Sequence, residues 1–140
     1  MSKQKTTIVV RLILESENKI LFLKKTLQNG GGYSLVGGKV EQRESPEYAI
    51  IRESLEEANI HIKPKHLRLR HIYKRDLNQE LILLYRAKKW KGNIETKEPD
   101  KFKKTVWLDK SDLPRNISNV TRQLLRAYFE ERFFEEEELM

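Results

Sequence analysis

The strongest constraint on this chain lies between Ser45 and Asn59, where the sequence predicts a helix with both ends marked. Ser45 is a favourable N-cap, and Pro46 suits the first helical position because its missing N–H needs no partner there. Asn59 tolerates the left-handed backbone conformation that often ends a helix. We therefore expect a helix from Pro46 to about Ala58, shortly after a pair of glycines.

Three glutamates fall on one face of this helix. Glu53, Glu56 and Glu57 are spaced i, i+3 and i+4, which places them side by side. Clustered carboxylates repel one another unless a cation or a basic side chain lies between them, and Arg52 can supply such a partner. An isolated stretch of this kind is more often a solvated helix face. The apolar residues expected to anchor the helix lie on the opposite face: Tyr48, Ile51, Leu55 and Ala58.

The residues around this face favour a metal site over a solvated surface. Gly37 and Gly38 allow the backbone to approach a ligand closely, and Glu44 lies just before the helix, where it could reach Arg52. No His or Cys is nearby, and a donor set made only of oxygens suits Mg²⁺, with Mn²⁺ as a substitute. A magnesium ion held by few carboxylates keeps positions open for water and substrate phosphates.

The register of these residues resembles the Nudix box. In order, the pattern is Gly38, five residues, Glu44, seven residues, Arg52-Glu53, two residues, Glu56-Glu57, one residue and Asn59-Ile60. All of the charged positions are present. Ser54 stands where the family usually has an aliphatic residue, and Asn59 stands where it usually has glycine. The chain is thus similar to Nudix hydrolases of the MutT-like kind, and the likeness extends loosely over most of its length.

This resemblance implies a fold and a set of roles. The fold would be α+β, a Nudix-type α/β/α sandwich with a mixed sheet between helices, formed by residues 1–140 as one domain. Mg²⁺ would be held by Glu53, Glu56, Glu57 and the backbone carbonyl of Gly38. Arg52 and Glu44 would orient these ligands.

The resemblance also implies a reaction in which water attacks a phosphorus atom of a pyrophosphate group. A carboxylate must accept the proton of that water, directly or through a second water. Glu53 is one candidate. Glu98 is another, because it resembles a glutamate that MutT-like members place outside the box as a base or metal ligand. An exposed loop carboxylate is the alternative interpretation of Glu98, and family members differ in which glutamate is the base.

Three further residues are candidates for substrate binding. Lys24 and Lys39 flank the expected phosphate site and could neutralise substrate charge, although for either lysine alone surface solubility is the favoured interpretation. Asn119 precedes the last predicted helix, where MutT-like members place an asparagine that reads a purine. Helix capping by Asn116 or Asn119 is the alternative.

The remaining elements are predicted from hydrophobic periodicity and turn residues. Thr6–Leu14 and Lys19–Lys24 are expected to form a hairpin around residues 15–18, and a C-terminal helix is expected from about Ile117. The other expected strands are Tyr33–Val36, Leu67–Tyr73, Glu80–Tyr85 and Thr105–Leu108. We expect the acidic residues 135–140 to form a solvated or frayed end.

Composition excludes several classes of function. The chain has no cysteine and no apolar run of the length that a membrane span needs, which predicts a cytoplasmic protein without disulfides or thiolate sites. The net charge of +7 includes an acidic end. The basic remainder suits a polyphosphate substrate, and polymeric nucleic acid is the less favoured partner.

These observations predict a Mg²⁺-dependent pyrophosphohydrolase that converts a nucleoside triphosphate to a nucleoside monophosphate and pyrophosphate. One alternative substrate is ADP-ribose or another nucleoside diphosphate sugar. The other alternative is a Nudix-shaped module that binds a nucleotide or RNA without turnover. The intact set of charged residues argues against that last alternative, because a pure binder has no need of three mutually repelling carboxylates.

Overall fold

The fold is known from a computed structural model, which describes residues 5–137. It contains two helices, α1 (Pro46–Ala58) and α2 (Asn119–Phe129). The strands are β1 (Thr7–Ile13), β2 (Glu15–Ser16), β3 (Lys19–Lys25), β4 (Tyr33–Ser34), β5 (Val36–Lys39), β6 (Leu67–Arg75), β7 (Glu80–Ala87), β8 (Phe102–Asp109) and β9 (Phe134–Glu136). Within residues 5–137, no helix is both long and apolar enough to cross a membrane.

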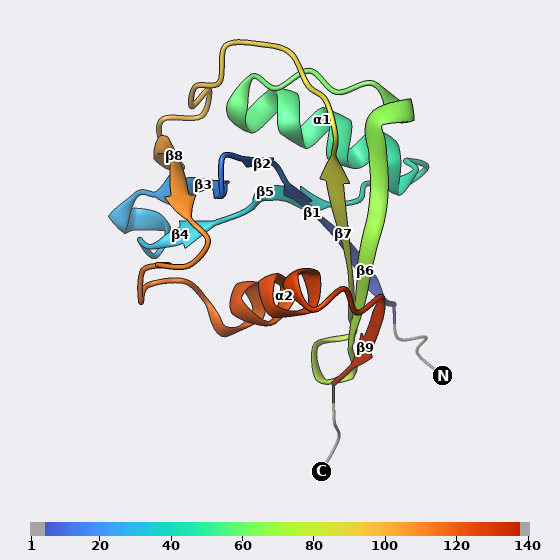
Figure 1. The fold of residues 1–140 in the computed structure, drawn as a ribbon. Coiled ribbons are helices and arrows are strands. Elements are labelled where there is room, and N and C mark those ends of the chain that lie inside the picture. Colours follow the sequence, from blue (N-terminus) through green and yellow to red (C-terminus); the bar gives the residue numbers. More distant parts are fainter. Residues whose placement is uncertain (1–4, 138–140) are drawn as a thin grey trace.

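The strands form two sheets between the helices (Figure 1). The larger sheet has the order β5-β1-β7-β6-β9 and is mixed, because β1 runs parallel to β7 and antiparallel to β5. In the smaller sheet β3 pairs antiparallel with β2, β4 and β8. Helix α1 covers one side of these strands and α2 covers the other (Figure 1). The predicted α+β sandwich with a mixed sheet is therefore confirmed.

Two hydrophobic clusters, one under each helix, hold the layers together. Strand side chains alternate between the two faces of a sheet, so Val10 and Leu12 of β1 pack in the cluster of α1 while Val9 and Ile13 pack in that of α2. Strands β3 and β7 divide their side chains in the same way. Strands buried on both faces become nearly continuous apolar runs, as the sequence shows at residues 8–14 and 20–23.

The predicted hairpin of Thr6–Leu14 with Lys19–Lys24 is mostly wrong. The turn is where expected, with Glu17 and Asn18 at φ of 48° and 70°. However, only the two residues of β2 pair with β3, while β1 leaves to become a central strand of the larger sheet. A strand that is apolar on both faces gains more by burial between two neighbours than by pairing at a sheet edge. Tyr33–Val36, predicted as one strand, is divided between β4 and β5.

Helix α1 begins and ends as predicted, but its buried face is rotated from the expected one. The Ser45 side chain accepts a hydrogen bond from the Tyr48 N–H, and Asn59 has a left-handed φ of 58°. Tyr48 and Leu55 are exposed, which corrects their predicted role as anchors. The buried residues are Ala49, Ile50, Ser54, Glu57 and Ala58. The helix turns toward the sheet so that Glu57 is covered, because that carboxylate has a partner there.

The acidic end is ordered over Glu135–Glu137, so the expectation of a frayed terminus is wrong for these residues. Strand β9 pairs in parallel with β6, and its acidic side chains meet basic partners. Arg132 lies 2.9 Å from Glu135, Lys74 lies 3.7 Å from Glu136, and Arg75 lies 3.7 Å from Glu137. Edge pairing and opposite charges together keep the segment on the sheet. Residues 138–140, also part of that expectation, lie outside the described residues.

The rotation of α1 predicts that two large aliphatic side chains on this helix differ in their contribution to stability. Ile50→Ala should lower the free energy of unfolding by about 2–5 kcal/mol, because Ile50 is fully buried in the core. Leu55→Ala should cost roughly 1 kcal/mol or less, because Leu55 is 38% exposed. Urea unfolding of both variants measures this difference. Equal losses would contradict the orientation of the helix.

Candidate active site

The site is built where β5 passes beneath α1 through Gly37 and Gly38. Gly37 has φ of +151°, and a Cβ at this position would lie 1.9 Å from the carbonyl oxygen of Val10 on β1. A Cβ on Gly38 would lie 2.7 Å from Oε2 of Glu53. At position 37 only glycine leaves room, because the neighbouring atom is backbone, and at position 38 a side chain would displace the Glu53 carboxylate. The glycine pair therefore brings β5 against the acidic face of α1.

Glu57 is the buried carboxylate at this contact. Its Oε1 accepts a hydrogen bond of 2.9 Å from the N–H of Gly37, and its side chain is covered by protein. Burial, together with the nearby charge of Glu53, raises the pKa of Glu57 to about 8. The Gly37 N–H and the charge of Arg11 oppose this rise. Two carboxylates are thus held together in a partly water-free place, where a cation would relieve their repulsion.

Arg52 connects the other acidic residues. Its Nε and Nη2 donate to the two oxygens of Glu44 at 2.6 and 3.0 Å, and its Nη1 donates to Glu53 at 2.6 Å. A weaker contact of 3.2 Å joins Nη1 to Glu56. Arg52 and its acidic partners stabilise one another's charged forms. The hydrogen bond from Arg52 lowers the pKa of Glu44, and the hydrogen bonds that Arg52 donates to Glu44 and Glu53 raise the pKa of Arg52. A two-pronged guanidinium contact fixes geometry as well as charge.

The donor set fits a hard divalent cation, although the three predicted ligands are not equally placed. Glu53 and Glu57 face the glycine bend, and the backbone of Gly38 passes beside Glu53. Glu56 is half exposed and turns toward Arg52 instead. Across residues 5–137, no group of three His, Cys, Asp or Glu side chains is already gathered as a cation cage. Metal binding by Glu53, Glu56, Glu57 and Gly38 stays a prediction, and it requires Glu56 to turn.

Glu98 lies in the β7–β8 connection, which is attached to the end of α1. The N–H of Lys97 donates to the backbone carbonyl of Glu57 at 3.2 Å, so Glu98 follows directly after that contact. Its partly exposed carboxylate lies 3.5 Å from Lys101. The structure therefore brings the Glu98 backbone near the acidic helix, and its role as base stays a prediction.

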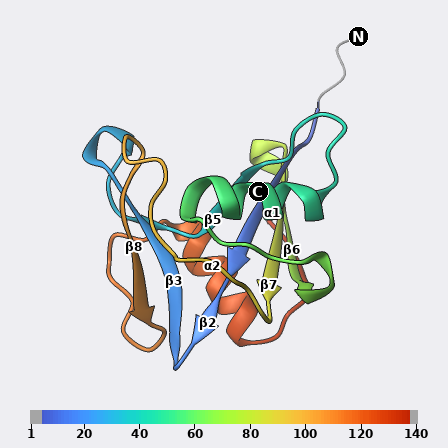
Figure 2. The same ribbon diagram turned by 90° about the horizontal axis from the view of Figure 1, so that it is seen from above.

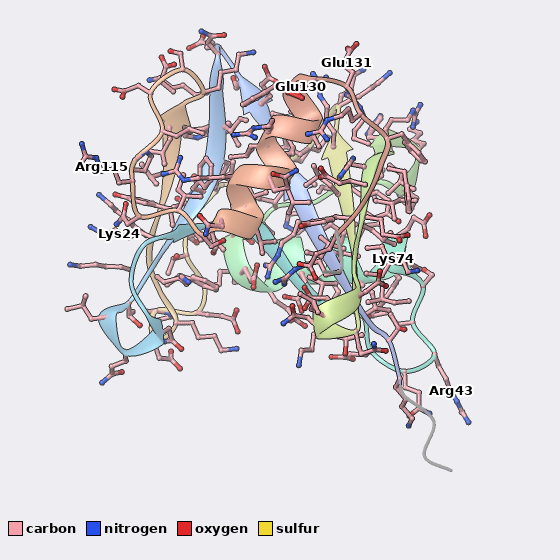
Figure 3. All side chains as sticks on the ribbon, turned by 90° about the horizontal axis from the view of Figure 1, so that it is seen from below. Lys24, Arg43, Lys74, Arg115, Glu130 and Glu131 are labelled. Atoms are coloured by element: carbon pink, nitrogen blue, oxygen red, sulfur yellow. The ribbon has the colours of Figure 1, made fainter. Side chains whose placement is uncertain are left out.

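The predicted substrate residues do not lie together. Lys24 contributes to a cavity of about 500 Å³ formed by β3, the following glycine loop, Lys103 and Asn116. The Lys24 side chain extends from the edge of the molecule near Arg115 (Figure 3). Its ammonium group lies 5.9 Å from the centroid of the Tyr33 ring. Lys39 is exposed beside the glycine bend. Asn119 is the exposed first residue of α2, and Ser118, rather than an asparagine, caps that helix.

Arg11 was missed by sequence reasoning. It pairs with Gly37 across β1 and β5, and its charge acts on both Glu57 and Glu53. Its Nη1 donates to the carbonyl of Leu35 at 3.3 Å. The available signal was one arginine inside an otherwise apolar strand, a position where an ionised side chain needs a partner.

Comparison with known proteins agrees with this geometry. The sequence model of the NUDIX domain family matches residues 3–128, which is most of the chain. The chain is a Nudix hydrolase. Residues after 128, including β9, lie beyond the matched range. The predictions of family and of an enzyme are therefore confirmed.

This Nudix hydrolase resembles one curated protein and several solved structures. An 8-oxo-dGTP diphosphatase of Proteus vulgaris is 34% identical over 64 residues, which cover 44% of this chain and 57% of that protein. The MutT NUDIX hydrolase of Burkholderia pseudomallei superposes with a TM-score of 0.78 at 24% identity, covering 88% of this chain and 98% of the other. A NUDIX hydrolase of Nitrosomonas europaea gives a TM-score of 0.79 at 25% identity, with 97% and 82% covered. The structural matches establish the shared fold.

The buried Glu57 predicts an unusual pH dependence of stability for the metal-free protein. Its pKa rises from an ordinary 4.5 in the unfolded chain to about 8 in the fold, so the folded state holds the proton more tightly. Stability should therefore be full below about pH 4.5 and fall as the pH rises toward about 8. The Glu57→Gln variant keeps a side chain of the same shape and an acceptor for the Gly37 N–H, but it has no group that ionises and so should not lose stability as the pH rises.

Urea unfolding in EDTA measures this effect. At pH 8.5 the Glu57→Gln variant should be more stable than wild type by at least about 1 kcal/mol, and the two should converge near pH 4.5. Glu56→Gln is the matched control, since Glu56 is half exposed and should show no such pH-dependent gain. A wild-type protein that gains stability between pH 5 and 8 relative to Glu57→Gln would refute the burial argument.

Proposed function

We propose that this Nudix hydrolase cleaves nucleoside triphosphates to nucleoside monophosphates and pyrophosphate, with Mg²⁺ held by Glu53, Glu56, Glu57 and the carbonyl of Gly38. The observation that carries the proposal is the pair of Glu53 and Glu57, held against the Gly37–Gly38 bend with Arg52 and Glu44 behind it. Such a pair has little value for folding, because its charges repel. It has value if a cation and a phosphate bind there.

Each residue of the site has a defined task in this proposal. When bound, a divalent cation lowers the pKa of a water and neutralises charge on the phosphate oxygens. Arg52 orients Glu53, and Glu44 fixes Arg52 through two hydrogen bonds. Gly37 holds Glu57 with its N–H. Glu53 and Glu57 are therefore positioned before the substrate arrives, so little of the binding energy is lost in ordering these two side chains, whereas Glu56 has to turn from Arg52.

The bond changes of the reaction are simple to state. A water oxygen forms a bond to the α- or β-phosphorus of the anhydride, and the P–O bond from that phosphorus to the bridging oxygen breaks. Attack on the α-phosphorus releases pyrophosphate as the leaving group, and attack on the β-phosphorus releases the nucleoside monophosphate. The water proton passes to a carboxylate, for which Glu53 and Glu98 are the candidates. Glu53 is adjacent to the glycine bend, whereas Glu98 would have to turn from Lys101. Lys39, exposed beside the bend, can attract the substrate phosphates.

A triphosphate substrate is supported by two observations. The curated relative is described as an 8-oxo-dGTP diphosphatase, although it aligns over only part of both chains. The cavity beside Lys24 adds Lys25, Lys103 and Asn116, which supply positive charge and an amide for a nucleotide. Asn119, the first residue of α2, could supply a second amide. The absence of cysteine fits an enzyme of the cytoplasmic nucleotide pool.

A substrate panel tests the proposed reaction. With Mg²⁺ present, nucleoside triphosphates should yield a nucleoside monophosphate and pyrophosphate, and EDTA should abolish the yield because the carboxylates then repel the phosphates. Ion chromatography of the products distinguishes the alternatives. Faster hydrolysis of ADP-ribose, giving a monophosphate and a sugar phosphate, would replace this substrate class with a nucleoside diphosphate sugar.

Substitution of the acidic face tests the site. Glu53→Gln, Glu56→Gln and Glu57→Gln should each lower kcat by about 10²-fold or more while the protein remains folded, because each removes a ligand charge or the base. Steady-state kinetics and circular dichroism measure the two effects. Glu47→Gln is the matched control, since Glu47 is an exposed carboxylate in the first turn of the same helix. Wild-type turnover by the Glu53 and Glu57 variants would reject the site.

A further inference from the structure

A second cavity of about 430 Å³ lies away from the acidic face. Two segments enclose it: the chain after α1, which contains the short 3₁₀ turn Pro64–His66, and the chain after β7. Seen from above, these segments run beside one another on the α1 side of the molecule (Figure 2). The lining residues are His61, Ile62, Lys63, His66, Lys89, Trp90 and Lys91. None of them belongs to the carboxylate site or to the cavity beside Lys24.

Backbone contacts make this cavity a fixed part of the fold. His61 and Lys91 exchange two backbone hydrogen bonds of 2.8 and 2.9 Å, and the N–H of Lys88 donates to the carbonyl of His66 at 2.9 Å. A Cβ on Gly92 would lie 2.3 Å from the carbonyl oxygen of Asn59, so the two segments are in close contact there. Main-chain pairing thus fixes the two segments that carry the lining side chains.

The positive charge around the cavity has no internal partner. Residues 61–68 and 88–92 contain six lysines and arginines and no aspartate or glutamate. Among residues 5–137, none of these six has a carboxylate within ion-pair distance: Lys63, Lys65, Arg68, Lys88, Lys89 and Lys91. Partial burial and the charges of Lys65, Lys89, Lys63 and Arg68 lower the pKa of His66. The local potential is therefore positive and favours an anion.

The interior of the cavity points to more than a simple anion. Its walls are mostly apolar, with Ile62 buried and the ring of Trp90 forming part of the lining. The ring of Trp90 packs against the ring of Trp107, with ring centroids 6.3 Å apart. A fixed indole with two imidazoles nearby offers a flat surface for a planar ring. The volume also falls within the range of roughly 300–1,000 Å³ that small-molecule sites occupy.

We propose that this cavity binds a nucleoside monophosphate or a closely similar aromatic phosphate, with the ring against Trp90 and the phosphate among Lys63, Lys89 and Lys91. An inorganic anion would not use the apolar wall, and an uncharged apolar ligand would not use the lysines. The inference does not rest on the proposed reaction, because the cavity shares no residue with the catalytic group.

The test is a titration of the full-length protein, labelled with ¹⁵N, with AMP in EDTA. The amide signals of His61 and Gly92 and the indole signal of Trp90 should shift to saturation, while those of Gly37 and Gly38 change little. Adenosine and inorganic phosphate should each bind at least about tenfold more weakly than AMP, because each lacks one half of the contacts. Shifts confined to Lys24–Gly32 or to the glycine bend would overturn the proposal.

Paired charge variants make the test specific. Lys89→Ala/Lys91→Ala should weaken AMP binding by about tenfold or more, because it removes lysines that line the cavity. Lys65→Ala/Lys88→Ala is the matched control, since it removes equal charge from the same segments but from side chains outside the lining. All four lysines are exposed, so neither pair should affect folding. Equal losses in both pairs would indicate unspecific attraction and overturn the site.

Titration with an oligonucleotide distinguishes a site for a small aromatic phosphate from a site for nucleic acid. A single-stranded oligonucleotide without terminal phosphates should bind no more tightly than AMP. If it binds more than about tenfold tighter, with the same dependence on Lys89 and Lys91, the surface is a nucleic-acid site and the small-molecule proposal is wrong.

Discussion

The hydrogen bond from the Gly37 N–H to the carboxylate of Glu57 joins β5 to α1 across twenty positions of the sequence. The contact needs a glycine on the strand, because a side chain at position 37 would collide with β1. It also needs the helix to be turned so that Glu57 is buried, at the expense of exposing Tyr48 and Leu55. Burial raises the pKa of this carboxyl group to about 8, so the fold disfavours its charged form unless a cation lies beside it.

Arg52 connects the other acidic residues of the site. Its guanidinium joins Glu44, Glu53 and Glu56, so the acidic face is partly neutralised before any ligand arrives. The same contacts attach the loop that precedes α1, since Glu44 also accepts a hydrogen bond from the N–H of Glu41. Lysine could not replace this arrangement, because a single ammonium group cannot make the two parallel contacts that fix Glu44. Orientation of the site and stability of the loop therefore depend on one side chain.

Charge is divided among separate regions of the molecule rather than spread evenly. The acidic helix face is balanced by Arg52 and Arg11, and the acidic strand β9 is balanced by Lys74, Arg75 and Arg132. The segments 61–68 and 88–92 have no such balance, which is why their lysines remain available to a ligand. Within residues 5–137, three of these lysines line one of the cavities described above, and Lys24, Lys25 and Lys103 line the other.

Local chemistry determined what the sequence revealed by itself. The caps of α1 and the spacing of Gly38, Glu44 and Arg52 depend on residues close together in the sequence, so the sequence alone predicts them. Tertiary structure alone decided the pairing of β1 with β7, the burial of Glu57 rather than Leu55, the position of Arg11 and the order of β9. Those outcomes depend on contacts between distant segments of the chain. Hydrophobic periodicity shows that a residue can be buried, but it does not show which partner covers that residue.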